Sequence, residues 1–330
     1  MPFDREITWL RVNQEKLFQI KRDLLRESYA LSVSLPLGLE FVVETNQKDQ
    51  LDHIKKLFKT DRTKSCEKGV AQIAGLKKED ISKYDIETTN IKSPYVGLID
   101  ETSNYGLLLG QDEGLLKSLI VGFASNLARE KGYYPAHASV CQIDDVGIML
   151  TGGHMAGKTA SLFSLLHAAG NDAQRKILAD DWVLVQEKTG EAITFEDKIS
   201  FTDKFSKEFR FLDLDRFFQM GQSGKAYVSP NEVYGSSTKI DKCNLNIVVL
   251  LEPLNRSSLI MPVDLDYIAS KIVECAYHMP ICNLAEEKMH KNFWKRFLNS
   301  KFVLSFDTRS GKGVSESYEI LYDYIFRRKK

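Results

Sequence analysis

Residues 146–169 read VGIMLTGGHMAGKTASLFSLLHAA, and this stretch decides the predicted fold. The apolar run VGIML predicts a buried strand, and the segment ASLFSLL predicts a helix. Between them, GGHMAGKT at residues 152–159 matches the pattern G-x-x-x-x-G-K-[ST] at every required position. A strand, a glycine-rich turn and a helix in this order are typical of a loop that binds phosphate groups. The stretch therefore predicts a phosphate-binding loop (P-loop) in an α/β protein.

Each residue type in the loop has a physical reason for its place. Gly152 and Gly157 permit backbone angles that turn N–H groups toward an anion, and the helix N-terminus adds its unpaired N–H groups. Lys158 supplies positive charge for the β and γ phosphates, and Thr159 supplies a hydroxyl ligand for magnesium. The alternative is a glycine-rich turn that only caps a helix. We expect ATP and Mg2+ as ligands, bound by Gly152, Gly153, His154, Met155, Ala156, Gly157, Lys158, Thr159 and Ala160.

A pair of adjacent acids lies one helix beyond the loop, in the segment LADDW at residues 178–182. Neighbouring side chains on a strand point to opposite faces, or diverge where the strand ends. One carboxylate can then face a metal ion while the other faces an acceptor hydroxyl. We predict Asp180 and Asp181 as magnesium ligand and general base, without assigning which is which, and place Thr159 in the same metal site. The alternative is a polar strand end without a chemical role.

Other polar residues near these motifs carry weaker signals. His154 contacts phosphate or substrate, or only fills the loop, and Ser139 reads as an ordinary strand serine because no G-x-S-x-G sequence surrounds it. Glu196 is either a third acid that orients an acceptor or part of a solvated strand face. A Gly/Ser-rich stretch is either a mobile lid or a plain surface loop, and its lysines are Lys225, Lys239 and Lys242.

The wider pattern interleaves strands with helices, which implies an α/β protein with a mixed sheet and flanking helices. Helical spacing predicts helices at residues 13–28, 50–59, 112–129, 158–169, 265–277 and 315–326. Strands are predicted at residues 37–45, 95–99, 105–109, 138–143, 146–151, 176–186, 192–200, 245–251 and 302–306. A composition shift separates a smaller N-terminal α+β region, residues 1–94, from a nucleotide-binding catalytic domain, residues 95–330. Within the first region, residues 61–90 read as loop and surface helix.

Composition and charge narrow the class of protein. The chain has 330 residues with 45 Lys and Arg against 45 Asp and Glu, and this balance argues against broad nucleic-acid binding. The sequence contains no apolar run of signal-peptide length or of the roughly 20 residues that a membrane-spanning helix needs. Its five cysteines are scattered without metal-ligand spacing, as expected for free thiols in a reducing compartment. We expect a cytoplasmic protein with no membrane or nucleic-acid partner, and the sequence is compatible with a homo-oligomer.

The order of these motifs resembles the HPr kinase/phosphorylase family and its wider set of HPr-kinase-like proteins. The resemblance rests on HAS at residues 137–139, two short strands, GGHMAGKT, a helix and LADD, and it covers residues 105–186. It implies the fold that this family shares with phosphoenolpyruvate carboxykinases. It also implies that His137 lines the active site, and that Asp180 and Asp181 divide the roles of base and magnesium ligand. A weaker similarity to the family is the strand entry at residues 242–249.

The combined expectation is an ATP-dependent kinase. It would transfer the γ-phosphoryl group to a hydroxyl, a serine of a protein or peptide according to the resemblance. The expected catalytic residues are Asp180, Asp181, His137 and Lys158. Two alternatives stay open: a kinase or carboxykinase that acts on a small metabolite with the same fold, and a nucleotide-binding regulatory module without turnover.

Overall fold

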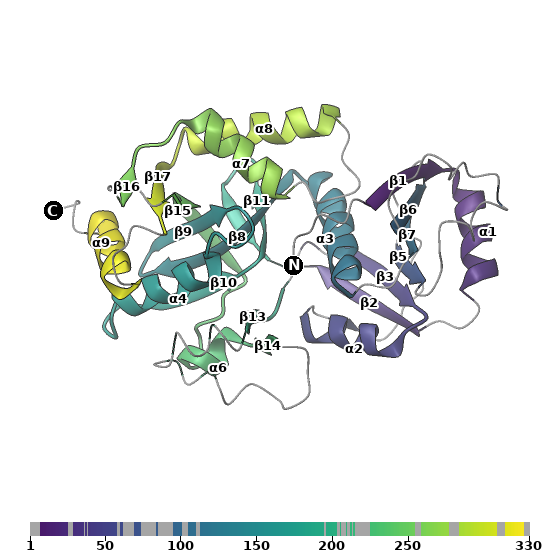
Figure 1. Ribbon diagram of the computed structural model, residues 1–330, viewed down its shortest axis with the longest axis horizontal. Coiled ribbons are helices and arrows are strands. Elements are labelled where there is room, and N and C mark those ends of the chain that lie inside the picture. The colour runs from purple at the N-terminus through teal and green to yellow at the C-terminus, as the bar shows by residue number, and fades with distance from the viewer. Residues whose placement is uncertain are drawn as a thin grey trace. The chain divides into compact units, whose positions relative to one another are not determined.

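The computed structural model describes residues 7–25, 29–35, 37, 39–57, 60–61, 69–73, 84, 95–100, 105–109, 113–194, 196–202, 205, 209, 212, 214, 225–254, 259–276, 284–308 and 314–326. The chain divides into two compact units. One unit comprises residues 1–131 with 277–283, and the other comprises residues 132–276 with 284–330. Figure 1 shows the described helices and strands of both units.

The first unit is built on a seven-stranded sheet in the order β1-β6-β7-β5-β3-β2-β4. Its strands are β1 (Ile7–Val12), β2 (Tyr29–Leu35), β3 (Leu39–Thr45), β4 (Thr60–Asp61), β5 (Gly69–Ile73), β6 (Tyr95–Asp100) and β7 (Tyr105–Leu109). Its helices are α1 (Gln14–Leu24), α2 (Lys48–Leu57) and α3 (Glu113–Arg129). Helix α1 begins where the Asn13 side chain accepts a hydrogen bond from the backbone N–H of Lys16, and it buries Leu17 and Ile20. This unit therefore has the α+β character expected for the N-terminal region.

The first unit differs from the sequence prediction in its strands and in its boundary, and the sequence does not predict strands β1 and β2. Residues 69–73 form strand β5, although the polar composition around them favours loop and surface helix; the other residues of 61–90 lie almost entirely outside the described part. The predicted boundary after residue 94 also differs from the division after Lys131. Strand β6 pairs in parallel with β1, and β7 pairs with β5, so both strands complete the N-terminal sheet.

The second unit is built on an eight-stranded mixed sheet in the order β10-β8-β11-β12-β15-β17-β16, with β9 paired to both β8 and β15. Its strands are β8 (Tyr133–Ile143), β9 (Val146–Gly152), β10 (Arg175–Ala179), β11 (Trp182–Gln186), β12 (Glu191–Ile193), β15 (Lys242–Glu252), β16 (Ile260–Met261) and β17 (Phe302–Asp307). Strands β9, β15 and β17 are parallel, whereas β8 is antiparallel to its neighbours β9, β10 and β11. The predicted mixed α/β architecture with flanking helices is confirmed.

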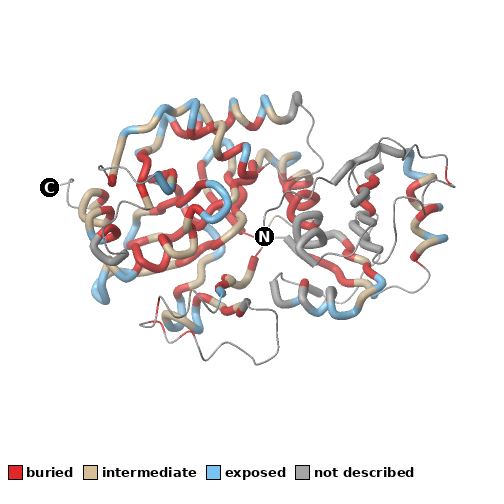
Figure 2. The backbone as a smooth tube through the Cα atoms, in the orientation of Figure 1, coloured by how far each residue is buried: buried red, intermediate tan, exposed pale blue. Residues whose placement is uncertain are grey.

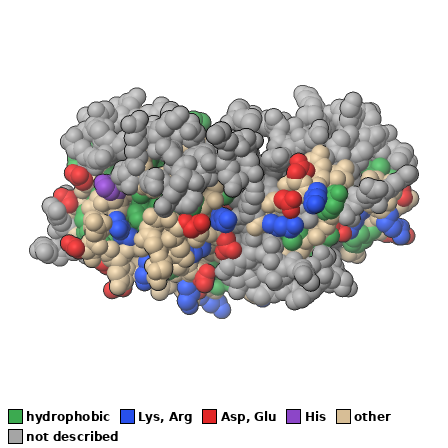
Figure 3. All heavy atoms as spheres, turned by 90° about the horizontal axis from the view of Figure 1, so that it is seen from below, with side chains coloured by type: hydrophobic (Ala, Val, Ile, Leu, Met, Phe, Trp, Pro, Cys, Tyr) green, Lys and Arg blue, Asp and Glu red, His purple; other side chains and the backbone are tan. Residues whose placement is uncertain are grey.

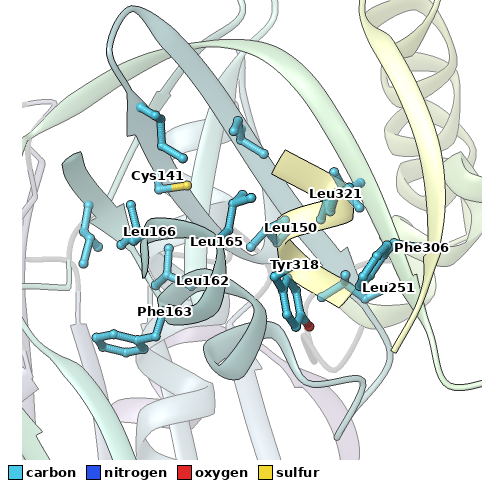
Figure 4. Packing of buried hydrophobic residues seen from close by; sticks show 14 of the residues in the cluster. Cys141, Leu150, Leu162, Phe163, Leu165, Leu166, Leu251, Phe306, Tyr318 and Leu321 are labelled. Atoms are coloured by element: carbon cyan, nitrogen blue, oxygen red, sulfur yellow. The ribbon is translucent and has the colours of Figure 1, made fainter. Parts of the chain in front are cut away.

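Helices cover this sheet on both faces (Figure 1). They are α4 (Lys158–Ala168), α7 (Leu265–Ala276), α8 (Leu284–Leu298) and α9 (Val314–Phe326). The unit also contains helix α6 (Pro230–Tyr234) and a two-stranded antiparallel sheet of β13 (Ile199–Thr202) and β14 (Lys225–Val228). Helix α4 contacts β8 and β9 on one side and α9 on another, so it is apolar around most of its surface. Figure 4 shows Leu162, Leu165 and Leu166 of α4 among Cys141, Leu150 and Leu321 in this core. Figure 2 shows the buried backbone concentrated in the same strands and helix.

The sequence locates most of these elements but misplaces some of their ends. The predicted strand 176–186 is two strands, β10 and β11, because the strand is interrupted at Asp180 and Asp181. The predicted strand 192–200 is likewise divided into β12 and β13. The sequence predicts neither the short elements β14, α6 and β16 nor helix α8. The pattern of α8, with buried Phe293 and Trp294 among charged residues, gives a weak periodic signal.

The surface agrees with the balanced charge of the sequence. On the described part of the face in Figure 3, acidic and basic side chains are intermingled. Among the helices that the structure describes, none is both long enough and apolar enough to cross a membrane.

Candidate active site

The glycine-rich loop connects the end of β9 to the start of α4, as the motif predicts. Gly157 stands at the N-cap of α4 with φ +88°, a left-handed conformation that glycine adopts without strain. Gly152 pairs with Leu251 of β15, and a Cβ atom there would lie 2.6 Å from the Leu251 carbonyl oxygen. The two glycines of the motif therefore serve different purposes: one permits the turn, and the other permits close approach of β15.

The Lys158 side chain folds back onto the loop. Its ammonium group donates hydrogen bonds to the carbonyl oxygens of Gly152 and Gly153, both at 3.1 Å, and the residue is buried. Burial lowers the pKa of Lys158, while the charges of Asp181, Cys275 and Asp180 act in the opposite direction. The loop thus holds a positive charge close to both acids of the predicted pair.

The remaining loop residues differ in exposure. His154 and Met155 face solvent, and Met155 is 79% exposed with φ +59°. Ala156 is buried in the core beneath the loop and donates its N–H to the carbonyl oxygen of Gly153 at 3.2 Å. Ala160 lies in the first turn of α4 and packs against the same core. The exposed loop tip is consequently His154 and Met155, with Gly153 beside them.

The acidic pair occupies a break in an otherwise continuous antiparallel pairing with β8. Strand β10 pairs with the second half of β8 and β11 with its first half, and the register of β10 shifts by one residue between Ile177 and Ala179, just before the pair. Such bulges re-aim side chains and are frequent near active sites. Ala138 of β8 pairs with Thr151 at the end of β9, and its N–H donates to the Asp181 carbonyl oxygen at 2.9 Å. The end of β9 and the acidic pair therefore flank the same residue.

Asp180 is buried and bonded through both carboxylate oxygens. Its Oδ1 accepts a hydrogen bond from the Ser139 hydroxyl at 2.9 Å, and its Oδ2 accepts one from the Thr159 hydroxyl at 3.1 Å. Burial and the neighbouring Asp181 raise the pKa of Asp180 to about 8, against the lowering effect of these two hydrogen bonds. The second of these bonds joins the glycine-rich loop directly to the acidic pair.

Asp181 is more exposed and contacts the predicted histidine. Its Oδ1 lies 2.6 Å from Nε2 of His137, and the two side chains are 34% and 16% exposed. The imidazole of His137 stacks on the indole of Trp182, with ring centroids 5.0 Å apart and an interplanar angle of 16°. The structure therefore brings together all four predicted catalytic residues. The two acids have different surroundings: Asp180 is buried, whereas Asp181 is partly accessible to solvent.

Three residues contribute more than the sequence indicates. Ser139 is a strand serine as predicted, yet its hydroxyl holds Asp180. Glu196 is 4% exposed and accepts a hydrogen bond from the Trp182 backbone, so the solvated-face interpretation is wrong. The Lys239 ammonium group donates to the carbonyl oxygens of Leu178 and Glu196 at 2.6 and 3.0 Å rather than lying on a plain surface loop. Ser139 and Lys239 are distant from the acidic pair in the sequence, and only tertiary pairing brings their side chains to it.

The donor set fits a hard divalent cation. Thr159 and Asp180 present two adjacent oxygen atoms, and the raised pKa of the Asp180 carboxyl reflects the cost of burying its negative charge, a cost that a bound cation would offset. Among the residues that the structure describes, three or more His, Cys, Asp or Glu side chains do not gather into a metal-binding group. A magnesium ion at this place would need further oxygen ligands, of the kind that a nucleotide phosphate provides.

Comparisons with known proteins add no family assignment. No protein-family model matches this chain, and a search of curated proteins finds no match either.

Proposed function

We propose that this protein is an ATP-dependent phosphotransferase that transfers the γ-phosphoryl group to a hydroxyl. The observation that carries the proposal is the hydrogen bond between Thr159 of the glycine-rich loop and Asp180 of the acidic pair. A loop that could bind phosphate and a carboxylate that could bind magnesium meet at this contact, and Lys158 lies beside them. A turn that merely capped a helix would not require a buried carboxylate.

The proposal includes the finer fold expected from the sequence, a P-loop domain like that of HPr kinases and phosphoenolpyruvate carboxykinases. Its support is the order of elements: β8 with His137, then β9, the glycine-rich loop, α4, β10 and the acidic pair. The ligands would be ATP, bound through the backbone N–H groups of the loop, and Mg2+, bound by Thr159 and Asp180. When bound, the metal supplies positive charge to the phosphate oxygens.

The two acids have distinct roles in this proposal. Asp180 is the buried metal ligand, because its partners are the Thr159 and Ser139 hydroxyls. Asp181 is the general base, because it is partly exposed and contacts His137. The acceptor oxygen forms a bond to the γ-phosphorus as the bond from that phosphorus to the β–γ bridging oxygen breaks. The acceptor proton passes to Asp181, and ADP leaves with the bridging electron pair.

The experiment incubates the purified chain with γ-labelled ATP, magnesium and a lysate of the source organism. We expect label on a serine of a protein or peptide, stable to acid as phosphate esters are, and its loss with Asp181→Asn. Asp145→Asn, which changes an exposed acid in the turn after β8, is the matched control. Label in a small acid-stable product would indicate a metabolite kinase instead. ATP binding without any transfer would contradict the proposed activity and favour a regulatory module.

A further inference from the structure

The start of β11 is held by side chains at the place where its backbone pairing stops. Strand β12 pairs with β11 only at Ile193 and Ala192, opposite Leu184 and Val185. Beyond this pairing, the backbone N–H and C=O groups at the start of β11 are those of Trp182. A backbone N–H or C=O left unpaired in the interior would cost free energy. The residues that follow β12 supply the missing partners through their side chains.

Two buried side chains provide these partners. Glu196 Oε2 accepts a hydrogen bond from the Trp182 N–H at 3.1 Å, and the Thr194 hydroxyl donates to the Trp182 carbonyl oxygen at 3.0 Å. The Glu196 N–H in turn donates to the Thr194 hydroxyl at 3.1 Å. Glu196 and Thr194 are only 4% and 6% exposed. A glutamate is rarely buried to this extent, because desolvation of its charge is costly.

The indole of Trp182 affects the position of the proposed base, Asp181, through His137. Trp182 and His137 are direct partners across β8 and β11, and their rings stack. Stacking limits rotation of the imidazole about its χ2 bond, which decides where Nε2 points. Nε2 lies 2.6 Å from Asp181. A shift of the indole would therefore change the geometry of the His137–Asp181 pair.

We propose that Glu196 is a positioning residue for the phosphoryl-transfer site. It fixes the Trp182 backbone, the Trp182 ring fixes His137, and His137 fixes the carboxylate of Asp181. The inference rests on the proposed function insofar as Asp181 is the base. Displacement of a reacting group by about 1 Å can reduce a rate by about 100-fold, so a support of this kind can matter without touching the substrate.

The kinetic experiment compares Glu196→Ala, Glu196→Gln and Glu191→Ala. Glu191 begins β12, and its carboxylate faces Lys242 rather than Trp182, so it serves as the control. We expect Glu196→Ala to lower kcat by about 10- to 100-fold with little change in KM for ATP. Glu196→Gln should restore most of kcat, because its amide oxygen still accepts the Trp182 N–H. A Glu196→Ala enzyme as fast as the control, or a Gln variant as slow as Ala, would overturn the proposal.

A second readout does not depend on activity. Imidazole quenches the emission of a stacked indole, and subtracting the spectrum of a matching Trp182→Phe variant removes the emission of the other tryptophans. We expect the Trp182 emission to change in Glu196→Ala and to be retained in Glu196→Gln. An unchanged emission in Glu196→Ala contradicts the inference even if the enzyme transfers phosphate. The expected change in a protein that transfers no phosphate contradicts only the proposed function. If Glu196→Ala does not fold, Thr194→Val removes the other support of Trp182 and should give the same changes.

Discussion

Lys158 is the residue whose replacement tests the glycine-rich loop most directly. Its ammonium group is held over the loop by two carbonyl oxygens. We expect Lys158→Ala to reduce phosphoryl transfer by about 10²–10³-fold, the usual effect of removing one electrostatic contact to the transition state. Initial rates at saturating ATP measure this, and Lys188→Ala in an exposed hairpin turn is the control. Normal turnover in a folded Lys158→Ala protein would exclude this loop as the catalytic phosphate site.

The two aspartates allow a test of divided roles at single residues. Asp181→Asn should keep magnesium-dependent ATP binding and lose transfer by about 10²–10⁴-fold, because the base is removed. Asp180→Asn should weaken the effect of magnesium on ATP affinity, because a charged oxygen ligand is lost. Calorimetric titration with and without magnesium separates the two. If both variants bind and turn over normally, the acidic pair is structural.

The buried Asp180 carboxyl also predicts a pH dependence of stability. Its pKa is raised from the ordinary value of 3.8 to about 8. Between about pH 4 and pH 8 the folded protein therefore keeps a proton on this carboxyl that the unfolded chain has released. The contribution of this group to the free energy of unfolding is therefore largest below about pH 4 and is lost as the pH rises toward 8. Asp180→Asn should raise Tm at pH 8 but not at pH 4. Thermal unfolding across this range measures the difference, and parallel curves for both proteins would refute the assignment.

At the scale of elements, the junction of β9 with the loop makes a prediction about two adjacent glycines. A Cβ atom at Gly152 would meet the Leu251 carbonyl oxygen at 2.6 Å, whereas a Cβ atom at Gly153 would meet nothing within 4 Å. We expect Gly152→Ala to lower Tm because β9 and β15 must separate, and Gly153→Ala to leave Tm unchanged. Calorimetry of the two variants checks this. Equal melting temperatures would mean that the β9–β15 pairing tolerates the added methyl group.

The glycine-rich loop and the acidic pair are visible in the sequence because their chemistry is local. GGHMAGKT at residues 152–159 specifies its own turn and helix start, and the strands and helix around it carry strong periodicity. The interruption at Asp180 and Asp181 is not visible, because it depends on how β10 and β11 pair with β8 in the folded sheet. The role of Glu196 is hidden for the same reason, since only tertiary pairing places its carboxylate on the Trp182 backbone.

At the scale of the whole molecule, the candidate site lies entirely in one of the two compact units. The glycine-rich loop, the acidic pair and His137 all fall within residues 132–276. Composition alone does not locate the division after Lys131, because the residues on both sides of it belong to well-packed elements. A boundary set by strand pairing leaves little trace in amino-acid usage.

This confinement predicts how ATP acts on thermal unfolding. Each unit contains its own sheet, so we expect two transitions in calorimetry. Magnesium-ATP at 100 times its Kd should stabilise one unit by about 2.7 kcal/mol and raise only that transition. Lys158→Ala should reduce this shift. A single transition, or an equal shift of two, would contradict the independence of the units.

The parallel pairing of β9 with β15 has a kinetic consequence. The Gly147 N–H donates to the side chain of Asn246, 99 residues later, and the two strands pair along the length of β9. A contact between such distant segments requires a long loop to close, and the chain loses conformational entropy before packing stabilises the contact. Proteins dominated by such contacts fold slowly. The nascent chain carries its glycine-rich loop long before β15 emerges to close the sheet beside it. The sheet beside the glycine-rich loop is therefore completed late in biogenesis, only after most of the chain has been synthesised.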